Sequence, residues 1–105
     1  MTARLSAVLA ELRRGLEAIY GDRLVKMILF GSQARGEAED GSDIDVLVVV
    51  RGGESTEEKE RRRQGIADLC LAQEVVIACL VMEEERFLHR QGPLLRNVRR
   101  EGVPV

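Results

Sequence analysis

The sequence has few aromatic side chains, which make up 3% of its 105 residues. Proteins that bind single-stranded nucleic acid stack bases on aromatic rings, so this shortage argues against that role. An excess of positive charge is also missing, because 16 basic and 18 acidic residues give a formal net charge of −2. That balance provides no general attraction to a polyphosphate backbone, and we do not expect nucleic-acid binding.

Cysteine and histidine are equally scarce. Cys70 and Cys79 form no CxxC pair, and the single His89 has no companion at metal-ligand spacing. We expect both cysteines to be small buried hydrophobic residues in a reduced, cytoplasmic protein. The N-terminal segment has Arg and Glu scattered among its apolar residues, so we expect neither a signal peptide nor a membrane span.

The length fits a single domain spanning residues 1–105, with one modest core. The chain contains no internal repeat and no low-complexity tract. It is too short to include a separate substrate-binding domain. A substrate would therefore be held by a partner, by a second copy of the chain or by the acceptor's own surface.

Hydrophobic periodicity predicts an amphipathic helix over residues 2–20. Tyr20 ends its apolar stripe and could be a self-modification site. Two short apolar runs, Leu24–Phe30 and Ile44–Val50, predict buried strands. This helical stripe, or the third strand described next, could support a homodimer or a complex with a partner.

The second half of the chain continues the alternation of helices and strands. Ser55 and Glu58 have the spacing of a capping box and predict a helix through about residue 71. Charge pairs at i,i+4, Glu57–Arg61 and Glu58–Arg62, would support its solvent face. A third strand is expected over Glu74–Met82. A helix should then begin at residues 83–85, and a last helix should span 94–101 between Pro93 and Gly102. The order predicts an α/β (α+β) fold: a small mixed β-sheet packed against helices.

The segment after the first strand, GSQARGEAEDGSD, should contain a turn and a short helical stretch, with Asp40 as a loop or cap residue. Gly31 lets the backbone turn sharply and lets a ligand approach closely. Ser32 offers a hydroxyl and a backbone N–H to an anion, and a helix starting here would add further N–H groups. Arg35 has a planar cation that suits phosphate oxygens, although a salt bridge to a local acid is the alternative.

Asp43 and Asp45 flank Ile44 at the start of the second strand. Because side chains alternate along a strand, both carboxylates point to the same face. Two carboxylates side by side repel each other unless cations lie between them, and Mg²⁺ is commonly bound by one or two carboxylates plus substrate phosphates. Paired metal ions can stabilise the attacking and leaving oxygens of an in-line displacement. Glu74 could complete a three-carboxylate cluster, as a metal ligand and a general base.

These residues bring the sequence close to a known family. Gly31-Ser32, ten further residues and then Asp43-Ile44-Asp45 inside an apolar strand resemble the DNA polymerase β-type nucleotidyltransferase superfamily. The string GSQARGEAEDGSDIDVLVVV and the ending PLLRNVRREGVPV are similar to its small prokaryotic branch, the minimal nucleotidyltransferase (MNT) domains.

The resemblance implies a Mg²⁺-dependent transfer of a nucleoside monophosphate, AMP from ATP, to a hydroxyl acceptor. Gly31 and Ser32 would hold the β- and γ-phosphates, and Asp43 and Asp45 would bind two Mg²⁺ ions. The third carboxylate, mapped to Glu74, would activate the nucleophile. Many members of the branch are antitoxins that modify a tyrosine of a HEPN-domain toxin, which makes such a toxin the implied partner.

Two other functions stay open at the level of sequence. The chain could be a catalytically weak antitoxin that neutralises its partner by binding alone, since Glu74 lies at the edge of its strand. It could also be a small-molecule nucleotidyltransferase, provided that a partner chain supplies the pocket for the acceptor.

Overall fold

The fold is described by a computed structural model that covers residues 2–36 and 43–105; Asp40 lies outside these ranges. In the described residues one mixed sheet has the strand order β3-β2-β1-β4. Its strands are β1 (Leu24–Phe30), β2 (Ile44–Val50), β3 (Ile77–Glu83) and β4 (Val103–Pro104). β1 is antiparallel to β2 and β4, whereas β2 and β3 are parallel. The predicted fold class is confirmed.

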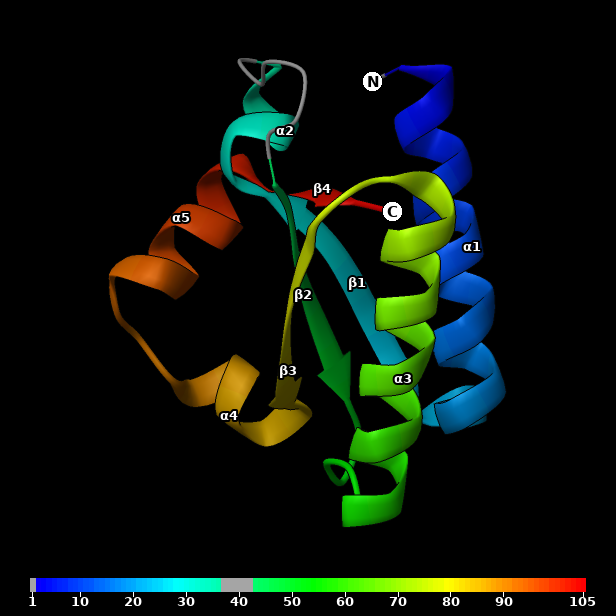
Figure 1. The fold of residues 1–105 in the computed structure, drawn as a ribbon. Helices are drawn as coiled ribbons and strands as arrows, with labels where there is room; N and C mark the ends of the chain where they lie inside the picture. The colour runs from blue at the N-terminus through cyan, green and yellow to red at the C-terminus, as the bar shows by residue number, and fades with distance from the viewer. Residues whose placement is uncertain (1, 37–42) are drawn as a thin grey trace.

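The helices cover the two faces of this sheet (Figure 1). They are α1 (Ala3–Tyr20), the 3₁₀ turn η1 (Gly21–Arg23), α2 (Gly31–Arg35), α3 (Thr56–Gln73), α4 (Glu84–His89) and α5 (Pro93–Glu101). α1 and α3 pack on one face, which we call the α1/α3 face. α4 and α5 pack on the other, the α4/α5 face. None of the helices in the described ranges is long and apolar enough to cross a membrane.

β2 lies in the interior of the sheet and divides its side chains between two hydrophobic clusters. Val46, Val48 and Val50 point to the α1/α3 face, where they meet the apolar stripe of α1. Leu47 and Val49 point to the α4/α5 face, against Phe87, Leu95 and Val98. Residues 46–50 are all fully buried, as expected of a strand covered on both faces.

The predicted strands at 24–30 and 44–50 are confirmed to the residue, but the third strand begins later than predicted. Glu74 is not its first residue. It adopts the left-handed conformation that ends α3, with φ 53° and ψ 47°. The next N–H, that of Val75, donates to the Cys70 carbonyl at 3.1 Å. β4 was not predicted, because its two residues form a strand only by pairing with distant β1.

The capping box at the start of α3 is confirmed. The Ser55 side chain accepts from the Glu58 N–H at 3.1 Å, and Glu58 accepts from the Ser55 N–H at 2.9 Å. The predicted Glu58–Arg62 pair is wrong, because both residues have partners outside the helix. Arg23 donates to Glu58 at 2.7 Å, and Arg62 donates to Glu54 at 2.8 Å. Glu57 and Arg61 form no ion pair within the described part of the chain either.

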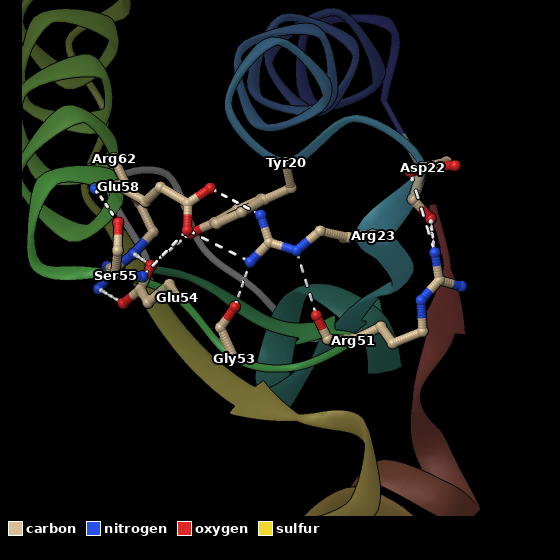
Figure 2. A network of polar contacts seen from close by, with 9 residues as sticks. All are labelled: Tyr20, Asp22, Arg23, Arg51, Gly53, Glu54, Ser55, Glu58 and Arg62. Atoms are coloured by element: carbon tan, nitrogen blue, oxygen red, sulfur yellow. Dashed lines mark hydrogen bonds and ion pairs between the residues drawn. The ribbon is translucent and has the colours of Figure 1, made fainter.

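A polar network joins the end of α1 to the start of α3 (Figure 2). Tyr20 donates its hydroxyl to Glu54, which also accepts two hydrogen bonds from Arg62. Burial, reinforced by the hydrogen bond to Glu54, raises the pKa of Tyr20 far above its ordinary value. Burial opposes ionisation of Glu54, but the hydrogen bonds from Arg62 and Tyr20 outweigh it and lower the pKa of this carboxyl. Since the Tyr20 side chain is buried and its hydroxyl is bound, self-modification at Tyr20 is not supported.

We predict that Glu54→Ala destabilises the protein by about 3 kcal/mol, because it leaves Arg62 without its partner in a poorly exposed position. Tyr20→Phe should cost about 1 kcal/mol, the usual net value of one hydrogen bond. Urea denaturation at neutral pH measures both losses, with exposed Glu57→Ala as the control that changes stability by less than about 0.5 kcal/mol.

The lowered pKa of Glu54 determines how the difference in stability between wild type and Glu54→Ala depends on pH. The stability that its charged form contributes is complete above the ordinary pKa of 4.5 and is lost as the pH falls through the lower, folded-state pKa. The gap between wild type and Glu54→Ala should therefore narrow in acid. A gap that widens below pH 4.5 would contradict this interpretation.

Candidate functional site

The candidate site lies where β1 ends and β2 begins, because these antiparallel strands bring Phe30 opposite Asp45. The next residue, Gly31, has φ +73°, a conformation that favours glycine. A Cβ placed on Gly31 would lie 2.5 Å from Asp45 Oδ2, so a side chain here would force the Asp45 carboxylate to shift. The positive φ and this close contact with the Asp45 carboxylate both favour glycine at position 31.

Asp43 and Asp45 both belong to the α4/α5 face, because side chains alternate along β2 and Leu47 in the same phase lies in that cluster. Asp45 is half-buried and Asp43 is exposed. Burial and then the negative charge of Asp43 raise the pKa of Asp45 above its ordinary value. The predicted carboxylate pair is thus on one face, and its two charges disfavour each other.

Ser32 follows Gly31 within α2, so a short helix does start at the predicted place. Arg35, in the last turn of α2, contacts Glu101 of α5 at 3.2 Å, with both side chains more than a third exposed. This ion pair with a residue of the C-terminal helix supports the structural alternative for Arg35. A contact between Arg35 and phosphate stays a prediction.

The third carboxylate does not join the pair. Within residues 2–36 and 43–105, no three His, Cys, Asp or Glu side chains are grouped closely enough to hold a metal ion. Glu74 is exposed at the C-terminal cap of α3, three residues before β3 begins. The expected cluster of Asp43, Asp45 and Glu74 is therefore not formed, because the chain uses position 74 to leave the helix.

The residue beside Asp45 on the neighbouring strand is Ala78. Paired residues of parallel strands point to the same face, so Ala78 occupies the place on β3 from which an acid would reach Asp45. Ala78 is small and exposed, which leaves open the surface between Asp45 and the sheet edge. Sequence reasoning missed this position. Its only signal is the lack of any acid between residues 75 and 82.

Perturbed pKa values alone would have pointed to the wrong end of the molecule. Hydrogen bonds from Arg23 and from the Ser55 backbone hold the pKa of Glu58 near 2. Yet Glu58 belongs to the network of Figure 2, beside the end of β2 opposite to Asp43 and Asp45. There each carboxylate has a guanidinium partner, as in a structural network. The carboxylates of Asp43 and Asp45 instead repel each other, which is typical of a binding site.

We predict that Asp45→Asn stabilises the ligand-free protein at pH 7 by about 0.5 kcal/mol, or roughly 2–4 °C in Tm. Because the pKa of Asp45 is raised in the folded state, the protein loses stability as the pH rises through that pKa and Asp45 becomes ionised. An amide at this position carries no charge and removes that cost. Thermal melts with a chelator present measure the gain, which should disappear in acid. Exposed Asp43→Asn should gain less, and a loss of stability in Asp45→Asn would contradict this reading.

A second substitution separates the two roles considered for Glu74. Glycine adopts the left-handed conformation without strain, so Glu74→Gly should raise stability by about 1 kcal/mol. If Glu74 only ends α3, nucleotide transfer by this variant should equal that of wild type. A loss of transfer in a correctly folded Glu74→Gly variant would restore Glu74 as the third carboxylate.

Comparison with known proteins agrees with this geometry. The family model of the nucleotidyltransferase domain matches residues 9–103. A proposed protein adenylyltransferase of Methanocaldococcus jannaschii, MJ0604, is 36% identical over 97 residues, which is 88% of each sequence. A solved structure of a proposed minimal nucleotidyltransferase is 27% identical, with TM-score 0.61 over 96% of this chain and 95% of that one.

A toxin–antitoxin complex crystallised with AMP-PNP is also similar, with TM-score 0.62, 19% identity and coverage of 89% of this chain and 68% of that one. At this identity the likeness shows a shared fold. The family uses nucleoside triphosphates and typically a divalent metal ion, which suits two neighbouring carboxylates beside a glycine turn. With the match covering nearly all of the sequence, the chain belongs to the nucleotidyltransferase domain family, as a minimal domain of the polymerase β-like fold.

Proposed function

We propose that this nucleotidyltransferase transfers AMP from ATP to a hydroxyl group of a partner protein. The observation that carries the proposal is the packing of Gly31 against Asp45, with Asp43 two residues away on the same face. This arrangement places a glycine turn beside two carboxylates that have no cationic partner within residues 2–36 and 43–105. The similarity to MJ0604 supports a protein as the acceptor.

Gly31 and Ser32 are the residues that we propose to hold the terminal phosphates. Gly31 lets the backbone turn sharply beside Asp45, and Ser32 offers a hydroxyl and an N–H. Arg35 lies at the other end of the same short helix, and we propose it as a further phosphate contact that would compete with its ion pair to Glu101. Because that ion pair is exposed, separating it costs little.

The donor set at Asp43 and Asp45 fits Mg²⁺, which prefers carboxylate oxygens and keeps the rest of its ligands as water and phosphate. The raised pKa of Asp45 supports this fit, because a nearby cation would relieve the repulsion from Asp43. Bound there, Mg²⁺ would neutralise charge on the phosphates during transfer. Asp43 and Asp45 would hold it and orient the nucleotide toward the acceptor.

In the transfer, the acceptor hydroxyl loses its proton to a base and its oxygen bonds to the α-phosphorus of ATP. The bond from that phosphorus to the bridging oxygen breaks, and pyrophosphate leaves with the electron pair. The products are an AMP ester of the acceptor, pyrophosphate and one proton. An in-line path is needed, so the acceptor must approach from the side opposite to the leaving pyrophosphate.

The partner that we propose is the toxin of a toxin–antitoxin pair, with a tyrosine of a HEPN-type toxin as the acceptor. The structural similarity to a toxin–antitoxin complex that contains AMP-PNP supports this choice. In this proposal the acceptor's own surface completes the site.

The test is transfer of label from α-³²P-ATP to protein, with Mg²⁺, in the presence of the product of the neighbouring gene. Wild type should label that protein, whereas the double variant Asp43→Asn/Asp45→Asn should lose at least about 100-fold in rate, since removing preorganised charge costs that much. Asp22→Asn is the matched control, because Asp22 is 96% exposed and remote from the site. Label that persists in the double variant or with chelator would overturn the proposal.

One observation favours a second function, in which the same fold neutralises its partner by binding alone. β3 provides Ala78, not an acid, beside Asp45, and Glu74 is used as a helix cap. Without a third carboxylate the base would have to come from elsewhere. If the double variant still relieves growth inhibition by the partner, binding alone is the mechanism.

A further inference from the structure

β3 has an unprotected outer edge. It is the last strand on its side of the sheet, and the segment 75–82 contains no charge and no proline. Exposed edges in natural proteins are normally blunted by charges, prolines, bulges or a very short strand. The opposite edge follows that rule, since β4 has two residues and one of them is Pro104.

The backbone groups on that edge can be assigned from the pairing with β2. The Val76 carbonyl accepts from the Ile44 N–H at 2.9 Å, so the residues in phase with it, Ala78 and Leu80, direct their backbone groups toward β2. The N–H and C=O groups of Ile77, Cys79 and Val81 therefore point outward. No element of the described chain pairs with them.

Apolar side chains also remain uncovered along this strand. α4 and α5 cover β1, β2 and the end of β3, but Val76 and Leu80 on the α4/α5 face are 56% and 46% exposed. Ala78 lies between them, directly beside Asp45. The uncovered surface is therefore continuous with the candidate active site.

Charge indicates which partner suits this edge. Glu74 precedes β3, Glu83 is its last residue and Glu84 begins α4; in the described residues none of the three forms an ion pair. Arg4 lies near the first end, where it donates to the Gln73 carbonyl. A second copy paired antiparallel about the middle of β3 would bring Glu74 of each chain near Glu83 and Glu84 of the other. This repulsion disfavours self-pairing and favours a segment with basic residues at both ends.

We propose that the outer edge of β3 binds an extended segment of the acceptor protein as an added strand, which delivers a tyrosine hydroxyl across Ala78 to the site at Asp45. This inference rests on the proposed function. Neighbouring strands are about 4.8 Å apart, so the added strand lies roughly 10 Å from β2. A tyrosine side chain spans most of that distance over the small Ala78, whereas a serine side chain does not.

The probe is a synthetic peptide with a central tyrosine, valines at alternate positions and two lysines at each end. Amide hydrogen exchange, followed by NMR on the whole chain, is the direct readout. Binding should slow exchange at Ile77, Cys79 and Val81, and leave Ala78 and Leu80 unchanged because β2 already protects them. Slowing at all five amides or at none would overturn strand addition.

Matched peptides and variants sharpen the result. A peptide N-methylated on its β3-facing amides and a peptide with glutamates in place of the lysines should each bind at least about tenfold more weakly. Leu80→Lys should weaken binding similarly, whereas Leu71→Lys, 80% exposed on α3, should not. Equal binding by the N-methylated peptide, or equal effects of the two lysine variants, would contradict the proposal.

Label transfer from α-³²P-ATP to the peptide separates this inference from the proposed function. The tyrosine peptide should be labelled, and its serine counterpart should not. Alternating protection without label would support the docking edge and count against AMP transfer. Label without alternating protection would support AMP transfer and overturn the docking edge.

Discussion

The register of β2 within the sheet is the constraint on which the site depends. Its five C-terminal residues are buried on two faces, and a slip of one residue would send every side chain to the other face. Because Val46, Val48 and Val50 belong with α1 and α3, Asp43 and Asp45 must lie on the face of α4 and α5. The burial of residues 46–50 thus fixes the face of the sheet on which Asp43 and Asp45 lie. The pairing of β2 with β1 then brings Asp45 against Gly31.

The carboxylates at the two ends of the sheet have different electrostatic surroundings. At one end Glu54 and Glu58 are matched by Arg62 and Arg23, which stabilises the junction of α1 with α3. At the other end Asp43 and Asp45 have no cationic partner among the described residues, and burial together with the charge of Asp43 raises the pKa of Asp45. The first arrangement contributes to the stability of the folded chain, whereas the second costs stability. The stabilising network and the candidate binding site therefore lie at opposite ends of the sheet.

Much of this could be predicted from the sequence where the signal is local. Short apolar runs predicted β1 and β2, and the Ser55 capping box predicted the start of α3, because each depends on residues close in the chain. Prediction failed where contacts between residues far apart in the sequence determine the local structure. β4 exists only through β1, and Arg23 draws Glu58 away from Arg62. Glu74 was misplaced because a left-handed cap leaves no mark on the apolar pattern that follows it, and the register that sets Ala78 beside Asp45 needs the assembled sheet.

The different connections of the strands have a consequence for how the molecule forms. β1 and β2 are antiparallel neighbours in sequence, but β3 reaches its parallel position only after the whole of α3 has crossed the sheet. Parallel pairing across such a crossover closes a long loop and is slow compared with local contacts. We therefore expect β3 to dock after β1 and β2 have paired. In a newly made chain, the carboxylate pair would be assembled before the edge beside it exists.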